Sequence, residues 1–327
     1  MLLKNRLLSI GSCIMGVAIF CVCIAVLGMP DKTILAKIDV FWLCVAIISQ
    51  ALLITFVAAR WRMLLASAQI SLAMGAAWRM VSIFTLVSLI LPRDLADVGG
   101  RGFWLAKHIN TNVAAACHLT LCDRLFELFL FLLMLPASFM FLAGAPFSVS
   151  FLVAGVSVIV GAVSIFILQN RFFFFFNLAF AVFGKLCSYV PFFRERIDWK
   201  ITPPAAPRER LLAAYGLTLV KFFVTVVYTL ACFKIVGFHL DWTAIILILP
   251  ATQLAFLISF APGGLGVVEL SWIAVLKTAT ALSHADISLY LIAQRLCVTV
   301  GSAVCALSAL AISSGRASEL KSGDRSR

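Results

Sequence analysis

Residues Thr243–Phe260, TAIILILPATQLAFLISF, form a long apolar segment that is followed at once by APGGLGVVEL at residues 261–270. The proline and three glycines at 262–266 interrupt the hydrophobic pattern, and a second apolar segment then continues to Leu282. Proline and glycine end a helix and let the chain turn sharply. A helix broken at membrane depth is tolerated only where protein or a water-filled cavity covers its backbone groups. We therefore predict a helical hairpin with its tip near Pro262.

A second broken helix is predicted near residue 92. The apolar segment Met80–Leu91 has only 12 residues, which is too short to cross the hydrocarbon core of a membrane. It is followed by PRDLADVGGR at residues 92–101, which forms a polar return leg. We therefore predict a hairpin whose tip contains Pro92 and whose return leg carries Asp97 and Arg101.

The composition identifies the class of protein that contains these hairpins. The 327 residues are 63% hydrophobic and 12% charged, whereas a soluble domain carries about 25% charged residues. This excludes a soluble enzyme, a nucleic-acid-binding module and a disordered regulator. Apolar segments near the spanning length of about 20 residues are Leu7–Gly28, Val40–Ala59, His118–Leu142, Phe147–Leu168, Leu211–Phe233 and Ile287–Ile312. The predicted fold is an all-α integral membrane protein with about six full transmembrane helices and two Pro/Gly-broken hairpins.

The basic residues predict the orientation of the chain in the membrane. The formal net charge of +12 lies in short segments between the apolar runs. With a cytoplasmic N-terminus, 18 of the 26 basic residues fall in cytoplasmic segments, and Arg60 and Arg101 are among them. Only Lys32, Lys37 and Lys234 fall in the outer segments. Cytoplasmic loops carry the excess of Lys and Arg, so both termini are predicted in the cytoplasm.

The two broken helices occupy matching positions in two halves of the chain. Pro92 precedes Arg124 by 32 residues, and Pro262 precedes Arg295 by 33 residues. This spacing predicts a duplication, with repeat one at about 40–142 and repeat two at about 211–312. Three full crossings separate the starts of the repeats, so they are predicted to be inverted. Inverted repeats place a transport site between their broken helices near the membrane midplane.

The rest of the chain is assigned to one domain and a tail. We predict a single transmembrane domain over residues 1–312, with an uncleaved first helix and a cytoplasmic linker at about 170–210. The linker contains a run of five phenylalanines and several prolines and arginines. The polar segment 313–327 is predicted to be a disordered cytoplasmic tail.

The segment PGGLGVVE at residues 262–269 resembles the flippase-like transmembrane domain named after lysylphosphatidylglycerol synthase. The resemblance extends over Val40–Ile312 and includes Arg60-Trp61 and Asp123-Arg124-Leu125. At the first hairpin the family usually has a glycine where this chain has Ala96, and the glycines fall instead at 99 and 100. Because only a short tail follows Ile312, we expect that the soluble aminoacyl-transfer half of the synthase is missing. The resemblance implies lipid translocation or an allied role, without synthesis.

The candidate site combines charges with backbone donors. Glu269 is expected about two turns into an apolar leg, where a charge costs about 3 kcal/mol, and Arg295 and Arg124 are candidate partners or headgroup clamps. A purely structural Glu269–Arg295 pair is the alternative. The helix start near Gly263 offers N–H groups to phosphate, unless the glycines serve only the turn. The predicted substrate-binding residues are Pro92, Asp97, Arg101, Asp123, Arg124, Pro262, Gly263, Gly264, Gly266, Glu269 and Arg295.

Three further charged residues are open to two interpretations each. Asp123 and Glu127 share a helix face with Arg124, and the interpretations are a site and a solvated network near the cytoplasmic end. Lys221 sits within an apolar helix, as a relay or phosphate contact or as a snorkelling side chain. No catalytic or metal-binding residues and no cofactor are predicted, because nucleotide-binding, metal and hydrolase motifs are absent from the sequence.

The leading hypothesis is a non-enzymatic, flippase-like transporter that moves a polar, anionic or modified lipid headgroup across a bacterial inner membrane. The alternatives are a membrane-embedded enzyme or accessory subunit acting on lipid-linked substrates, and a small-solute secondary transporter. The expected partners are membrane lipids, with a homo-oligomer and a separate synthase or lipid-modifying enzyme left open. Nucleic acid is not an expected partner.

Overall fold

The computed structural model describes residues 39–91, 95–109, 113–188, 207–257 and 264–323, and these residues form helices and connecting turns without a strand. The elements are α3 (Val40–Ser67), α4 (Met74–Val87), the π-helix η1 (Leu95–Gly100), α5 (Arg101–Ile109), α6 (Val113–Leu142), α7 (Phe147–Ser188), α9 (Arg208–Ile235), α10 (Trp242–Leu257), α11 (Val267–Ala279) and α12 (His284–Gly323). Of these, α3, α6, α7, α9 and α12 contain segments long and apolar enough to cross a membrane. The prediction of an all-α membrane protein is confirmed. The predicted first helix, Leu7–Gly28, lies outside the described residues.

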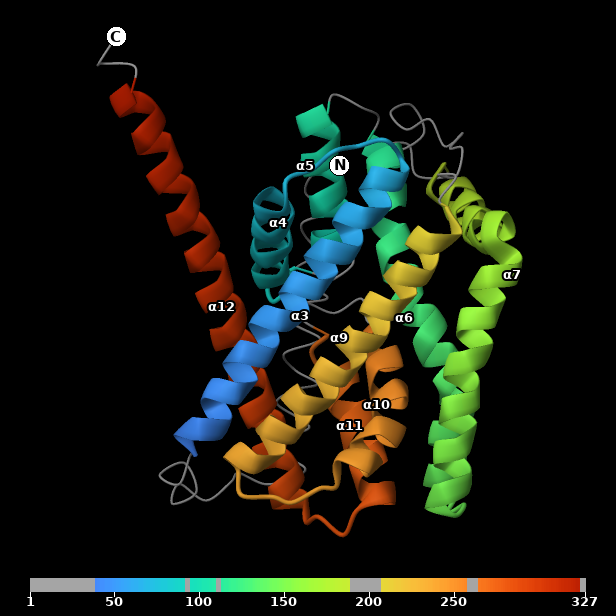
Figure 1. Ribbon diagram of the computed structural model, residues 1–327. Helices are drawn as coiled ribbons and strands as arrows, with labels where there is room; N and C mark the ends of the chain where they lie inside the picture. Colours follow the sequence, from blue (N-terminus) through green and yellow to red (C-terminus); the bar gives the residue numbers. More distant parts are fainter. Residues whose placement is uncertain (1–38, 92–94, 110–112, 189–206, 258–263, 324–327) are drawn as a thin grey trace.

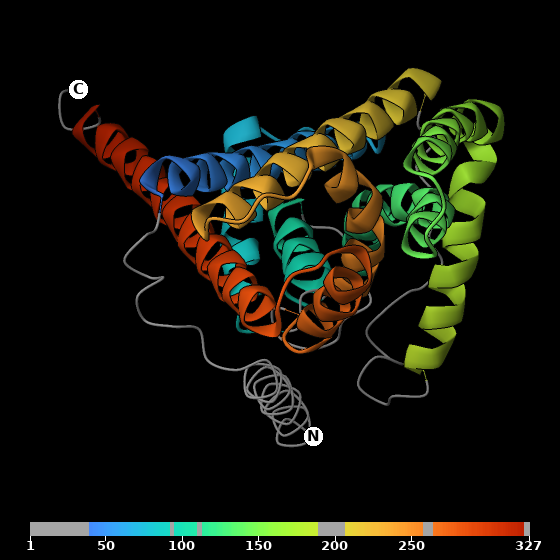
Figure 2. The ribbon, with the colours of Figure 1, turned by 90° about the horizontal axis from the view of Figure 1, so that it is seen from below.

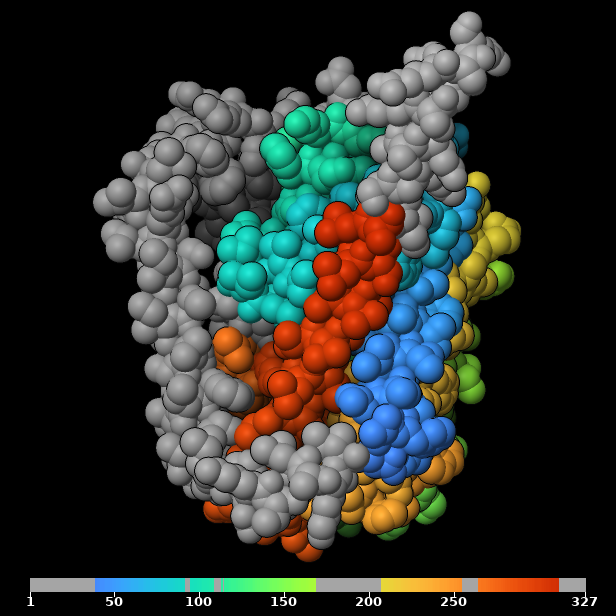
Figure 3. Space-filling model, turned by 90° about the vertical axis from the view of Figure 1, so that its left-hand side faces the viewer, coloured from blue at the N-terminus to red at the C-terminus, as the bar shows by residue number. Residues whose placement is uncertain are grey.

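Two long antiparallel helices, α3 and α9, form one face of the molecule and have the most extensive contact of any two elements described (Figure 1). The α3 helix begins at Asp39, whose side chain accepts a hydrogen bond from the backbone N–H of Phe41 at 2.9 Å. Such a cap satisfies one of the donors that a helix start leaves open. The α12 helix packs against α3 and α4, and Figure 3 shows α12 (red) lying against α3 (blue).

The close contact between α12 and α3 depends on a glycine. A Cβ atom at Gly301 would lie 2.8 Å from Cγ of Gln50, so a larger residue would push the helices apart. Beside it, Nε2 of Gln50 donates a hydrogen bond to Oγ of Ser302 at 3.2 Å. This contact holds one side of the cavity described below.

The predicted broken helices appear as two pairs of short helices in opposite halves of the molecule. The α4, η1 and α5 elements lie in the upper half of Figure 1, and α10 and α11 lie in the lower half. Seen from below, α11 and α12 lie side by side in front of the teal α5 region (Figure 2). The tips at Pro92 and Pro262 lie outside the described residues. The structure describes the helices on either side of each tip.

An aromatic cluster anchors the second short pair. The rings of Phe233 and Tyr290 stack with centroids 3.9 Å apart, and Trp272 meets both edge-on. All three side chains are fully buried. Because aromatic packing of this kind adds to area burial, it fixes α9, α11 and α12 together close to Glu269 and Arg295.

Three helices continue at least eight residues beyond the C-terminal ends that the sequence analysis predicted. The α3 helix continues past Ala59 to Ser67, α7 continues past Leu168 to Ser188, and α12 continues past Ile312 to Gly323. The predicted linker and disordered tail are therefore partly helical. None of the three extensions contains proline, so polarity alone did not end these helices.

Candidate functional site

Six buried charged side chains form a closed ring of alternating sign. In order around the ring they are Arg60, Asp123, Arg101, Asp97, Arg124 and Glu127. Their side chains are at most 10% exposed. The ring draws its members from α3, η1, α5 and α6, so it ties four elements of the first half of the chain to one point.

Arg60 holds one side of this ring. Its Nε lies 2.6 Å from Oδ1 of Asp123, and its Nη2 lies 2.5 Å from Oε1 of Glu127. Its Nη1 donates a hydrogen bond to Oγ1 of Thr218 on α9 at 2.8 Å. All three nitrogens of the guanidinium therefore have partners, as a buried charge requires.

The first hairpin supplies the opposite side of the ring. Nε of Arg101 lies 2.6 Å from Oδ1 of Asp97, and its Nη1 lies 3.3 Å from Oδ2 of Asp123. The other carboxylate oxygen of Asp97 pairs with Nη2 of Arg124. The Arg101 guanidinium also lies 5.1 Å from the ring centroid of Trp61, within cation–π range.

The local backbone of the hairpin places Asp97 and Arg101. Residues Leu95–Gly100 form a π-helix that leads directly into α5, and such wide turns are often found at functional sites. The glycines allow close packing here: a Cβ at Gly100 would meet the ring of Phe84, and a Cβ at Gly102 would lie 2.7 Å from Cα of Cys117. The return leg is therefore tightly packed at Gly100 and Gly102.

Lys221 on α9 joins the ring at Glu127. Its Nζ lies 2.5 Å from Oε2 of Glu127, and its side chain is 14% exposed. The snorkelling interpretation of Lys221 is therefore wrong. The solvated interpretation of Asp123 and Glu127 is also wrong, since both are buried beneath α3 and the first hairpin.

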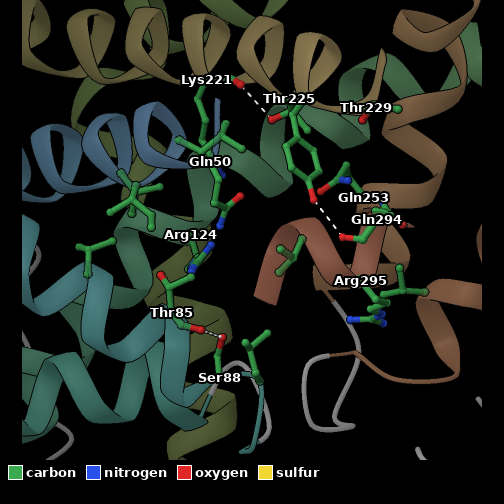
Figure 4. A pocket seen from close by; sticks show the side chains of 18 residues that line it. Gln50, Thr85, Ser88, Arg124, Lys221, Thr225, Thr229, Gln253, Gln294 and Arg295 are labelled. Carbon is green, nitrogen blue, oxygen red and sulfur yellow. Dashed lines mark hydrogen bonds between the residues drawn. The ribbon is translucent and has the colours of Figure 1, made fainter. Parts of the chain in front are cut away.

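A cavity of about 140 Å³ lies beside the ring and is lined by three cationic side chains, Arg124, Lys221 and Arg295 (Figure 4). The rest of the described lining is uncharged. Its polar members are Gln50, Thr85, Ser88, Thr225, Tyr228, Thr229, Gln253 and Gln294, and its apolar members are Leu53, Ile54, Val57, Val81, Leu89, Val268 and Val298. Both broken helix pairs contribute to the wall, since Ser88 directly follows α4, Gln253 belongs to α10 and Val268 to α11. The structure thus brings Arg124 and Arg295, the two arginines matched in the repeat, to one cavity.

Glu269 lies in the first turn of α11, not two turns into a leg as predicted, because the helix begins only at Val267. Its Oε2 accepts a hydrogen bond from the N–H of Gly266 at 2.7 Å, and its Oε1 lies 2.5 Å from Nε of Arg295. Glu269 is 1% exposed and does not line the cavity. An internal carboxylate therefore uses the N–H group of Gly266 at the helix start, where the sequence analysis expected phosphate to bind.

The glycines before α11 have a backbone reason of their own. Gly264 and Gly266 have φ values of 71° and 83°, in the left-handed region that other residues adopt only with strain. This supports the interpretation that they form the turn. Pro92, Pro262 and Gly263, which were also predicted as site residues, lie outside the described residues.

Sequence reasoning missed Arg60 and most of the uncharged lining of the cavity, including Gln50. Arg60 was assigned to a cytoplasmic loop, although the apolar residues Leu64 and Leu65 follow it without a helix breaker. That continuation was the available signal that Arg60 lies within a buried helix. Gln50 gave a weaker signal, as an amide near the middle of an apolar helix.

The family model for the lysylphosphatidylglycerol synthase TM region matches residues 13–305. The chain belongs to this family. The match includes every member of the ion ring and every residue that lines the cavity. No curated protein and no solved structure matches the chain. Among the described residues, no group of three His, Cys, Asp or Glu side chains is placed to hold a metal ion.

Proposed function

We propose that this protein is a flippase-like transporter that moves a polar lipid headgroup across the membrane. The observation that carries the proposal is the convergence of Arg124, Lys221 and Arg295 on one cavity between the two broken helix pairs. A lipid headgroup carries a phosphate, and guanidinium and ammonium groups in a low-dielectric site bind phosphate strongly. Membership of a family named for a lysylphosphatidylglycerol synthase supports a lipid-related role.

The ion ring holds two of the cavity's cationic side chains in place. Arg124 and Lys221 both contact Glu127, so their charged ends are held in place before a headgroup arrives. Binding groups that are already ordered lose less entropy when a ligand binds. The acyl chains stay in the bilayer in this mechanism, and only the headgroup enters the cavity.

The placement of the short helices supports an inverted-repeat transporter. The α4–α5 and α10–α11 pairs occupy opposite halves of the molecule, as inversion of two repeats requires (Figure 1). Arg60 and Arg101 are buried in protein and no longer count as loop charges, which leaves 16 of the 18 basic residues assigned to the cytoplasmic side against three outside. We therefore propose an inner-membrane location with both termini in the cytoplasm, and re-entrant tips at both helix breaks.

We propose that the chain carries no enzymatic activity of its own. The described lining of the cavity consists of cations, neutral polar groups and apolar side chains, which suit binding rather than proton transfer. A separate synthase or lipid-modifying enzyme would supply the lipid, and association of two copies of the chain is compatible with this role.

The size of the cavity favours one second candidate. Drug-sized ligands occupy pockets of about 300–1,000 Å³, so a cavity of about 140 Å³ also fits a small anionic solute. Such a transporter would use the same three cations. Uptake of inorganic phosphate into protein-containing vesicles measures this alternative directly.

The test of lipid movement uses the purified chain in vesicles that contain a trace of fluorescent phosphatidylglycerol. An impermeant reductant bleaches the outer-leaflet probe, so movement appears as bleaching beyond half of the total. Lys221→Gln should slow this movement at least about tenfold, because one charge-assisted contact is worth about 1.5–3 kcal/mol. Lys107→Gln changes an exposed lysine on α5 and serves as the matched control. Movement no faster than in protein-free vesicles, with folded protein present, would exclude the proposed function.

A further inference from the structure

Both hairpins place a carboxylate in the first turn of the return leg. Asp97 lies in the first turn of η1, and Glu269 lies in the first turn of α11. Asp97 precedes Arg124 by 27 residues, and Glu269 precedes Arg295 by 26 residues. The two halves of the chain therefore match in a carboxylate on the return leg and an arginine on the long helix that follows.

In the first half, Asp97 joins the hairpin to Arg124. Its Oδ1 lies 2.6 Å from Nε of Arg101 on the same return leg, and its Oδ2 pairs with Nη2 of Arg124 on α6. Arg124 also has a carboxylate neighbour on its own helix, since its Nη1 lies 3.5 Å from Oε2 of Glu127. Of these two carboxylates, Asp97 is the one that ties the position of Arg124 to the hairpin.

In the second half, Glu269 makes the equivalent connection. Its Oε2 accepts a hydrogen bond from the N–H of Gly266 at 2.7 Å, directly before α11, and its Oε1 lies 2.5 Å from Nε of Arg295 on α12. In both halves, one carboxylate oxygen is bound within the hairpin and the other holds an arginine of the next long helix. Charge-assisted contacts of this kind are short and fix the orientation of the groups that they join.

The arginines reach the cavity, and the carboxylates lie behind them. Arg124 and Arg295 line the cavity, with side chains that are 10% and 19% exposed. The side chains of Asp97 and Glu269 are 2% and 1% exposed, and neither residue lines the cavity. Figure 4 shows Arg124 and Arg295 on different sides of the pocket. Each carboxylate would therefore act on a bound ligand through its arginine.

We propose that Asp97 and Glu269 are equivalent positioning residues, each of which orients one cavity arginine toward a bound phosphate group. This inference rests on the proposed function and deepens it, because it assigns a role in binding to residues that do not line the cavity. The phosphate is that of a lipid headgroup or of a small anionic solute. A guanidinium binds phosphate through two parallel N–H groups, so a change in its orientation weakens the contact even when the charge remains.

The test is a set of double-mutant cycles that are read out as ligand affinity. Asp97→Asn and Glu269→Gln remove the carboxylate charge, and Arg124→Gln and Arg295→Gln remove the guanidinium. The purified chain in detergent is titrated against acyl-labelled phosphatidylglycerol, and the dissociation constant is determined per folded molecule. Loss of a positioning carboxylate should weaken binding about three- to tenfold in the otherwise unchanged chain, and less than about twofold once its arginine has been replaced.

Crossed pairs from the two hairpins provide the matched control. They are Asp97→Asn with Arg295→Gln, and Glu269→Gln with Arg124→Gln. Substitutions in separate contact networks contribute nearly independently, so the coupling in the crossed pairs should be at least about threefold smaller than in the matched pairs. A general loss of structure would not distinguish matched from crossed pairs. Coupling in the matched pairs that is no larger than in the crossed pairs would overturn the inference.

Charge-conserving variants decide the question if the neutral variants do not fold. Asp97→Glu and Glu269→Asp keep the negative charge but shift it by one methylene group. Each should weaken binding when its arginine is present and have little effect once that arginine is replaced by glutamine. Unchanged affinity in both folded variants would contradict an orienting role.

Binding and transport are measured separately, so the two proposals can fail separately. Matched coupling in a chain that moves lipid no faster than protein-free vesicles would keep the positioning role and reject the flippase role. Additive effects in a chain that moves lipid would reject only the positioning role. Inorganic phosphate is the second probe, and matched coupling with phosphate alone would keep the positioning role and assign it to the small-solute candidate. A chain that binds neither probe would reject both proposals.

Discussion

Nζ of Lys221 on α9 lies 2.5 Å from Oε2 of Glu127 on α6. The two residues belong to different parts of the site. Glu127 belongs to the buried ring through Arg60, whereas Lys221 lines the cavity. The lysine therefore connects a buried, fully paired network to the space in which we propose that a headgroup binds. A substitution in the ion ring should therefore affect binding in the cavity, and a substitution in the cavity should affect the ion ring.

Glu127→Gln should lower the stability of the chain by about 3–5 kcal/mol, because it removes the carboxylate charge that Arg60, Arg124 and Lys221 share in the buried network. Thermal unfolding in detergent measures the effect. Glu209→Gln removes an exposed carboxylate from α9 and should leave the unfolding temperature unchanged. Equal unfolding temperatures for both variants would show that the ring contributes little to stability.

The Glu269–Arg295 pair should behave as a coupled structural unit. Glu269→Gln removes the carboxylate charge that pairs with Arg295 and weakens the cap on Gly266, so it should lower stability by about 2–4 kcal/mol. The double variant with Arg295→Gln should lose less than the sum of the two single variants. Thermal unfolding of all three variants gives the coupling, and strict additivity would show that the pair has no energetic role.

Arg295 should differ from Glu269 in transport, because only Arg295 lines the cavity. Arg295→Gln should slow headgroup movement about tenfold or more per folded molecule, whereas Glu269→Gln should have a smaller effect. The vesicle assay, normalised to folded protein, measures both. The opposite order of effects would place the binding group at the helix start instead of the cavity.

Gly301→Val should push α12 away from α3, because even its Cβ would lie 2.8 Å from Cγ of Gln50. Overpacking of this kind costs about 1–3 kcal/mol, and the loss of the Gln50–Ser302 contact adds to it. Gly155→Val on α7 meets nothing within 4 Å and is the matched control. Unfolding temperatures that match for the two variants would contradict the close approach of these helices.

Single cysteines in a cysteine-free background test the orientation. Replacement of the exposed residues Ala143 and His284 should allow labelling by an impermeant thiol reagent in intact cells, and replacement of the exposed Ser71 should not. Labelling of Ser71→Cys alone would reverse the proposed orientation.

The sequence pattern predicted a helix start where glycines precede an apolar segment in the second half of the chain. Gly266 is an example, since its positive φ requires glycine and α11 begins directly after it. The ends at Ala59 and Ile312 were predicted too early, because charge alone was taken as a helix end. Charge inside a helix is compatible with burial when tertiary contacts pair it, and tertiary contacts are not local in sequence.

The sequence analysis identified several charged residues of the site but not how they pair in space. Arg124 and Arg295 were singled out by their spacing from two prolines, and both line the cavity. Arg60 was missed because its partners, Asp123 and Glu127, lie in a different helix. Spacing within one helix reveals neighbours on that helix, whereas the ring needs four elements to meet.

Because of the closed ring, the first short helix pair is held to its neighbours by more of the described ion pairs than the second. Displacing η1 or α5 would separate Asp97 and Arg101 from partners on α6 and leave several buried charges exposed to an apolar medium. Among the described residues, α11 has one ionic attachment to a neighbouring helix, the contact of Glu269 with Arg295. If the proposed transport involves a motion that opens the cavity to one side, that motion would meet its smallest electrostatic resistance at α11, while the helices joined by the ion ring would stay together.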